Sequence, residues 1–141
     1  MLAKALLVWL GLLVVAVLNG GVRNAVLAPL FGELAGHAIS TGILCGVIVS
    51  VAWLTIPWLG PRGVHQALLI GTVWMVLTVA FEFLGGHYLF GHSWQRLLAD
   101  YDLLRGRVWI LVPLASLLAP LWAFSRRGKR NGGSPVSGQR R

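Results

Sequence analysis

Residues 36–58 read GHAISTGILCGVIVSVAWLTIPW, an apolar run without a single Asp, Glu, Lys or Arg. An α-helix rises about 1.5 Å per residue, so a run of this length crosses the roughly 30 Å hydrocarbon core of a bilayer. Three further apolar runs reach or approach the same length, at 2–19, 67–84 and 108–124. The sequence therefore predicts an all-α integral membrane protein, a bundle of four transmembrane helices.

The composition of the whole chain indicates the same environment. Of the 141 residues, 57% are hydrophobic and 11% are charged, whereas a water-soluble domain has roughly 25% charged residues. The net charge of +8 does not indicate nucleic-acid binding, because half of the Lys and Arg residues lie after residue 124, beyond the last apolar run. The single cysteine, Cys45, excludes an intramolecular disulfide and a thiolate metal cluster within one chain.

The charges between the spans predict how the helices are oriented. With four spans, the N-terminus, the turn at 60–66 and the C-terminal segment share one side of the membrane, and that side carries the larger excess of Lys and Arg. Because cytoplasmic loops are rich in Lys and Arg, both termini are predicted to be cytoplasmic. A cleaved signal peptide is the alternative for the first run, but Ala16, Val17 and Leu18 make a poor cleavage site.

The C-terminal residues 125–141 form a basic tail. Six of them are Lys or Arg, and Gly, Ser and Pro make up most of the rest. A segment of this composition cannot bury enough apolar surface to fold, so a disordered cytoplasmic tail is predicted. Its charge is expected to attract anionic lipids at the membrane surface.

The segment between the third and fourth spans has a helical repeat. Its apolar residues recur at helical spacing and are Trp94, Leu97, Leu98, Tyr101 and Leu104, whereas Arg96 and Asp100 lie on the other face. This pattern predicts an interfacial amphipathic helix before the last span, with Ser93 as its N-terminal cap.

Small residues recur along the second span. Ala38, Gly42, Gly46 and Ser50 are spaced by four, so they form one stripe on a helix. Such a stripe lets another helix approach closely, and packing inside the bundle is the favoured interpretation. A dimer interface is the alternative.

Polar residues are predicted to form a layer near the outer ends of the helices. Counting along the helices places six of them at a similar depth: Arg23, Asn24, Glu33, His37, Glu82 and His87. An ionisable group at this depth is costly unless it is paired, so a functional site is the default hypothesis. Glu82 is accordingly predicted to lie within hydrogen-bond or ion-pair reach of Arg23, His37 or His87. The structural alternative is an Arg23–Glu82 pair, with Glu33 stabilising a helix start and the histidines at headgroup level.

Three chemistries are compatible with this layer. A divalent metal would take Glu33, His37, Glu82 and His87 as nominal ligands, although no HExxH or comparable motif is present. A Glu beside a His can also relay protons. Arg23 with Asn24 and the neighbouring helix start can instead hold an anionic head group.

Four longer stretches carry a resemblance to a known group. They are LNGGVRN at 18–24, FGELAGH at 31–37, FEFLGGHYLFGHSW at 81–94 and LLADYDLLRGR at 97–107. Their combination resembles small bacterial membrane proteins with four spans, and the resemblance extends over most of the chain up to Trp122. The resemblance implies a bacterial inner-membrane location, but it implies no activity for this chain.

These observations favour a non-enzymatic inner-membrane accessory or binding module. Its Glu/His/Arg layer near the periplasmic face would hold a lipid, a small ligand or a partner helix. One alternative is a small transporter or proton-linked channel formed by an oligomer, because four short helices alone enclose little pore. The other is a metal-dependent membrane enzyme. The expected partners are the bilayer itself, anionic lipids at the tail, and a second copy or another membrane protein.

Overall fold

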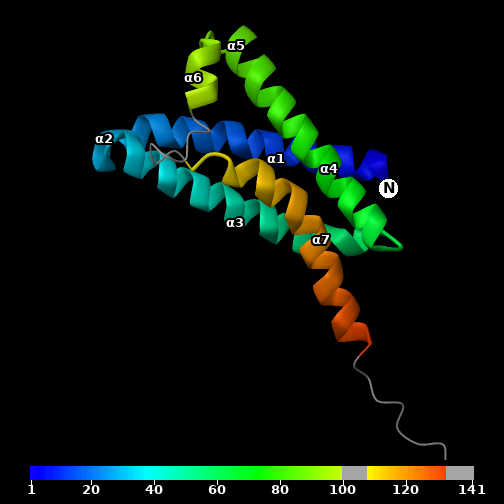
Figure 1. Cartoon of the computed structure of the whole chain (residues 1–141). Coiled ribbons are helices and arrows are strands. Elements are labelled where there is room, and N and C mark those ends of the chain that lie inside the picture. Colours follow the sequence, from blue (N-terminus) through cyan, green and yellow to red (C-terminus); the bar gives the residue numbers. More distant parts are fainter. Residues whose placement is uncertain (100–107, 133–141) are drawn as a thin grey trace, which may run out of the picture.

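The structure is a computed structural model that describes residues 1–99 and 108–132. Every regular element within these two ranges is helical (Figure 1), which confirms the predicted all-α class. In chain order the elements are α1 (Leu2–Val22), η1 (Arg23–Leu27), α2 (Ala28–Phe31), α3 (Glu33–Leu59), α4 (Val64–Ala80), η2 (Phe81–Gly85), α5 (Gly86–Tyr88), α6 (Trp94–Ala99) and α7 (Leu111–Asn131). The segments η1 and η2 are π-helical, and through them α1 continues into α2 and α4 continues into α5.

Two turns end these long helices in the same way. Each follows a Leu-Phe-Gly stretch, and the glycine has a positive φ, +88° at Gly32 and +70° at Gly91. Glycine adopts this left-handed region without the steric penalty that a side chain brings. The chain therefore leaves α2 directly into α3, and leaves the α5 end toward α6.

Three helices are long and apolar enough to cross a membrane. They are Leu2–Phe31, Glu33–Leu59 and Val64–Tyr88. The first and third are longer than the predicted spans at 2–19 and 67–84, because the π-helical segments extend them. By helix length and composition the chain is therefore a membrane protein.

The helix α7 is not among these three. Its apolar part ends at Phe124, about 21 Å from Leu111 at 1.5 Å per residue, and basic residues follow. The sequence predicts disorder from Ser125, whereas the structure continues α7 to Asn131. Residues 133–141, the rest of the predicted tail, lie outside the described residues.

One basic side chain explains why the helix continues. The guanidinium of Arg127 donates from Nε and Nη2 to the carbonyl of Trp53, at 3.1 and 2.7 Å. It also lies over the Trp53 ring, 4.4 Å from the centroid. Extending an existing helix needs no new nucleation, so this anchor suffices to hold the added turns.

The helix α7 packs tightly against α3 and α4. At the α4–α7 crossing, a Cβ on Gly71 would collide with the carbonyl of Leu117, so only glycine allows this approach. Ile70 and Trp74 of α4 are fully buried beside it, as is Ala123 of α7. The apolar core therefore lies where α3, α4 and α7 meet.

The helix α1 runs antiparallel to α3. Near its start, Lys4 Nζ donates to the carbonyl of Trp58 at 3.1 Å. Near its end, Asn19 Nδ2 donates to the hydroxyl of Ser40 at 2.7 Å. These contacts place the N-terminus beside the α3–α4 turn, and they place η1 beside the start of α3.

The helix α1 meets α4 only along part of its length. The Trp74 indole donates to the carbonyl of Ala5 at 2.9 Å, and the Trp9 indole donates to Thr78 Oγ1 at 3.1 Å. Beyond this point α4 rises away from α1 (Figure 1). The divergence leaves room for a cavity between the two helices.

The small-residue stripe of α3 faces outward. Ala38, Gly42, Gly46 and Ser50 are all exposed, and a Cβ on Gly42 or Gly46 would meet nothing within 4 Å. The favoured interpretation, close packing inside the bundle, is therefore wrong for the described residues. The physical reason is that α7 packs on the opposite, larger-residue face, where Leu44 and Ile48 are buried.

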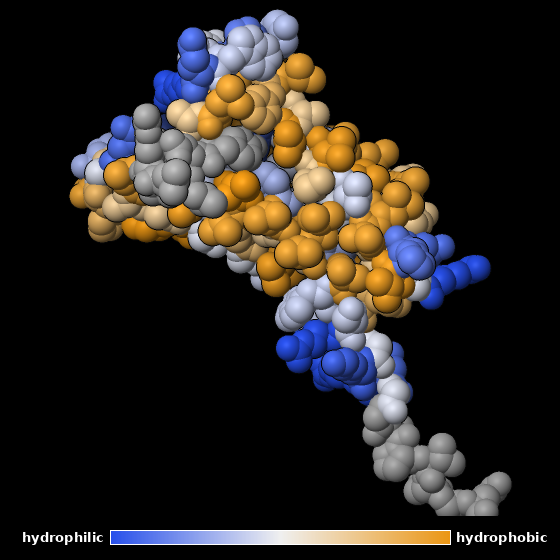
Figure 2. Space-filling model, in the orientation of Figure 1, coloured by the Kyte–Doolittle hydropathy of each residue, from blue (hydrophilic) through white to orange (hydrophobic). Residues whose placement is uncertain are grey.

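The outer surface suits lipid. Figure 2 shows apolar side chains covering the middle of the molecule, with hydrophilic ones at the α5–α6 end, at the N-terminal end and along the end of α7. Large side chains are exposed in the apolar region, for example Leu7, Leu18 and Leu54 at 62%, 65% and 71%. Apolar exposure on this scale is found where a membrane or partner covers it.

Candidate functional site

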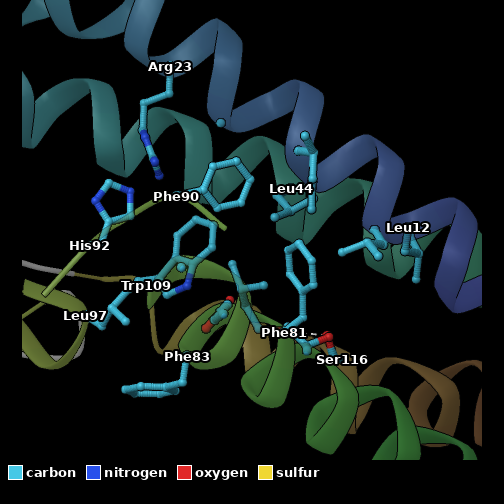
Figure 3. A pocket seen from close by; sticks show the side chains of 18 of the residues that line it. Leu12, Arg23, Leu44, Phe81, Phe83, Phe90, His92, Leu97, Trp109 and Ser116 are labelled. Atoms are coloured by element: carbon cyan, nitrogen blue, oxygen red, sulfur yellow. Dashed lines mark hydrogen bonds between the residues drawn. The ribbon is translucent and has the colours of Figure 1, made fainter. Parts of the chain in front are cut away.

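A cavity of about 420 Å³ lies between α1, α3, α4 and α7 (Figure 3). Its volume falls within the range of small-molecule sites, roughly 300–1,000 Å³. On α1 its lining runs from Trp9 to Asn24, about 22 Å along the helix axis. The cavity is therefore elongated in the direction of α1.

One end of the cavity is apolar. Its lining there includes Leu12, Ala16, Leu44, Ile48 and Val112, of which Leu12, Leu44, Ile48 and Val112 belong to the buried core. Figure 3 shows Leu12 at the end of the cavity away from Arg23 and His92, with Leu44 between them. This end offers contacts to a hydrocarbon group and few hydrogen-bonding partners.

The other end is polar. Its lining includes Arg23, Asn24, Glu82, His92 and Arg96. Arg23 and Asn24 come from η1, Glu82 from η2, and Arg96 from α6. The cavity thus grades from hydrocarbon contacts at one end to charged groups at the other.

The two π-helical segments position this polar end. Arg23 is the first residue of η1, and Glu82 is the second residue of η2. A π-helical turn widens the helix by one residue and often occurs at functional sites. Here both such turns carry a charged side chain to the same cavity.

Arg23 lies against an aromatic ring. Its guanidinium carbon is 5.5 Å from the centroid of the Trp109 ring, within the range of a cation–π interaction. Its Nε donates to Asn24 Oδ1 at 3.5 Å. His37 meets the same ring edge-on, with centroids 5.5 Å apart. Trp109 lines the cavity and His37 does not.

The structure brings together three of the six predicted site residues. Arg23, Asn24 and Glu82 line the cavity, as the depth count predicts. The proposed reach of Glu82 to Arg23 stays a prediction, supported by their common cavity. His37 and His87, its other two predicted partners, do not line the cavity.

The remaining three predicted residues lie elsewhere. His37 is buried and in edge contact with the Trp109 ring. Glu33 is exposed in the first turn of α3, where a carboxylate is favoured by the helix dipole. The ring of His87 stacks on Trp94 with centroids 4.0 Å apart, and its Nδ1 lies 2.8 Å from the carbonyl of His92.

The nominal metal ligands are therefore not assembled. Among the described residues no three His, Cys, Asp or Glu side chains gather as a metal site would require. The left-handed turn at Gly32 starts α3 anew, so Glu33 falls at an exposed helix end. Trp94 holds the His87 ring by stacking.

Several lining residues were not predicted as part of the site. Trp9 and Trp109 both line the cavity, although neither belongs to the predicted polar layer. A signal exists for Trp9, since it lies about 10 Å along α1 from Leu2, too deep for the headgroup region. His92 and Arg96 carry no such signal, and both follow the turn at Gly91 before they reach the rim of the cavity.

Comparisons with known proteins add no assignment. No protein-family model, curated protein or solved structure matches the chain. The functional argument therefore rests on the geometry and the chemistry of the cavity.

Proposed function

We propose that this protein is a non-enzymatic inner-membrane binding module whose cavity holds an amphipathic ligand. The single observation that carries the proposal is the gradient inside the cavity, from Leu12 and Leu44 at one end to Arg23 and Arg96 at the other. A chain-like apolar group fits the first end, because burying it there removes hydrocarbon surface from contact with polar groups. A charged head group fits the second end.

The polar end favours an anionic head group. Its described lining carries two guanidinium groups, Arg23 and Arg96, against one carboxylate, Glu82. Guanidinium groups bind carboxylates and phosphates by strong charge-assisted hydrogen bonds. The ligand is therefore a molecule with a carboxylate or phosphate head.

The same geometry gives less support to the other candidate functions. Conduction of an ion would need charged side chains along its path, and the described residues at the apolar end of the cavity supply none. A metal-dependent enzyme needs a set of ligands, and no three candidate ligands gather in the part of the chain that the structure describes.

The proposed topology has four spans, with α7 as a short fourth one and both termini in the cytoplasm. Lys4 beside Trp58, Arg62 in the α3–α4 turn and the basic end of α7 support it, because Lys and Arg concentrate on the cytoplasmic side. A short span is tolerated when long basic side chains reach back to the interface. The described part of the predicted amphipathic helix is α6, which buries Leu97 and would lie at the periplasmic interface.

The proposed partners are membrane components. The exposed basic residues of α7 are Arg126, Lys129 and Arg130, and they would attract anionic lipids of the cytoplasmic leaflet. The outward stripe from Ala38 to Ser50 would accept a second copy or another membrane protein, since small residues allow close helix contact.

The experiment uses tryptophan fluorescence. Brominated stearate, an anionic single-chain lipid, quenches tryptophan on contact, and Trp9 and Trp109 line the cavity. Wild-type protein in phosphatidylcholine nanodiscs is expected to show saturable quenching. The variant Ala16→Phe fills the cavity and is expected to remove the saturable part, whereas Ala3→Phe, at an exposed position of α1, should not. Equal saturable quenching in all three proteins would rule the cavity out as the binding site.

A further inference from the structure

We infer that the ligand is a lipid of the surrounding bilayer and that its chain enters the cavity sideways, between α1 and α4. The inference rests on the proposed function and goes beyond it, because it names the source of the ligand and its route. It begins from an apolar groove on the outer surface, lined by Leu77, Ala80, Leu84 and Leu89. Two further residues, Trp9 and Phe81, line both this groove and the cavity.

Trp9 and Phe81 therefore form the wall between the groove and the cavity. The Trp9 indole donates one hydrogen bond, to Thr78 Oγ1 at 3.1 Å, and the contact is only partly buried. Phe81 is the first residue of η2, and its ring lies over Gly85 so closely that a Cβ there would sit 3.1 Å from it. Two aromatic rings and one exchangeable hydrogen bond separate the bilayer from the cavity.

The α1–α4 seam is firm only on the other side of this wall. Ala5 and Trp74 are fully buried and joined by a 2.9 Å hydrogen bond. One turn further along, the Trp9 indole donates a hydrogen bond to Thr78 in a contact that is only partly buried. Beyond it α4 diverges from α1 (Figure 1). The wall thus stands where the two helices begin to part, which is where a small rotation of either ring opens the most space.

The chemistry of the path selects the occupant. From the groove to the Leu12 end of the cavity the lining is mostly hydrocarbon and aromatic, and the hydroxyls of Thr78 and Ser116 already take part in hydrogen bonds. A dissolved polar molecule therefore gains little there. An acyl chain already in the bilayer moves between similar environments along this path. Its head group would slide along the outer end of the helices toward Arg23 and Arg96, whose charge complements a phosphate or carboxylate. A two-chain phospholipid would leave its second chain in the groove, and a fatty acid would use the cavity alone.

The test separates the route from the binding. Protein in phosphatidylcholine vesicles is mixed with vesicles that contain brominated stearate, and the initial rate of tryptophan quenching is measured. The quenching of Ala16→Phe is subtracted, so only cavity uptake remains. The variant Ala80→Phe fills the groove and is expected to slow this uptake about tenfold, the effect of a small added barrier. The matched control Val76→Phe, at an exposed position on the same helix and outside the groove, should take up the probe at the wild-type rate.

A second variant tests the wall itself. Trp9→Ala removes the larger ring and its hydrogen bond, and it is expected to speed uptake about tenfold. Trp58→Ala, which removes an exposed tryptophan far from the cavity, should not. Uptake by Ala80→Phe at the rate of Val76→Phe, or uptake by Trp9→Ala no faster than by Trp58→Ala, would overturn lateral entry.

If the cavity binds no lipid at all, the result differs from that expected when only lateral entry is wrong. In that case wild-type protein would show no quenching beyond that of Ala16→Phe at any time. Repeating the assay with a brominated phosphatidylglycerol distinguishes the two lipid sources. Uptake of stearate alone assigns the site to fatty acids, and uptake of both assigns it to anionic lipids in general.

Discussion

The contacts of α4 with α7 and with α1 differ in how closely the helices approach each other. At the α4–α7 contact, Gly71 allows the backbone of α7 so near that a single methyl group would collide with Leu117. At the α1–α4 contact, Trp74 and Thr78 form hydrogen bonds with α1, and the two helices then diverge to leave a cavity of about 420 Å³. The difference indicates separate roles for the two contacts. The close-packed α4–α7 contact supplies stability, and the α1–α4 contact supplies a place for a ligand.

The largest expected effect is at the close-packed α4–α7 contact. Gly71→Ala places a methyl group against backbone that cannot move aside, so it is expected to destabilise the fold by about 3 kcal/mol or more. Gly46→Ala makes the same chemical change where nothing lies within 4 Å, and it is expected to leave stability unchanged or raise it slightly, since alanine favours helix. Unfolding in mixed micelles measures both. Equal stability of the two variants would contradict the claim that close packing at Gly71 stabilises the fold.

A smaller difference is expected along the α1–α4 seam. Trp74→Phe leaves the carbonyl of Ala5 without its donor in a fully buried contact, which should cost about 1–3 kcal/mol of unfolding free energy. Trp9→Phe removes the donor to Thr78 in a partly buried contact, and its cost should stay below about 1 kcal/mol. The same unfolding assay checks the order. A larger loss of stability for Trp9→Phe would mean that the Trp9–Thr78 contact, and not the Trp74–Ala5 contact, is the main link between α1 and α4.

The sequence predicts the long helices of this fold better than the cavity. Apolar runs predict where the three long helices lie, because length and hydropathy depend on the chain alone. The divergence of α4 from α1 depends on tertiary packing, and the two π-helical segments change the helix phase at Arg23 and Glu82. A depth count does not show toward which side of a helix a residue points. It therefore identifies Arg23 and Glu82 but cannot separate them from His37, which does not line the cavity.

The same limit explains why the small-residue stripe misleads. Spacing by four shows that Ala38, Gly42 and Gly46 share a face, but it does not show which face turns inward. The larger residues Leu44 and Ile48 fill the space beside α7 instead. Size complementarity between specific helices decides which face of α3 turns inward, and this complementarity cannot be read from a single sequence.

The next effect is on ligand binding. Arg23→Gln removes the guanidinium from the polar end of the cavity and is expected to weaken the binding of brominated stearate about tenfold, since a charge-assisted hydrogen bond contributes roughly 1.5–3 kcal/mol. Arg62→Gln removes the same charge at the exposed α3–α4 turn and should leave binding unchanged. Titration by tryptophan quenching measures both affinities. If the two variants bound alike, the α1–α4 cavity would not hold the head group at Arg23.

The smallest effect is expected at the C-terminus, where the structural anchor and the remaining basic residues can be separated. Removal of residues 133–141 takes away two arginines but keeps Arg127 and its hydrogen bonds to the carbonyl of Trp53. Stability and stearate binding should therefore change by less than about 0.5 kcal/mol, as for most surface changes. Arg127→Gln keeps the full length and loses the anchor, so it should cost about 1 kcal/mol more than the truncation. Arg127 contacts the carbonyl of Trp53, and neither of these two residues lines the cavity. Neither change should therefore alter the affinity for stearate, and a truncation that abolished binding in correctly inserted protein would make the tail part of the ligand site.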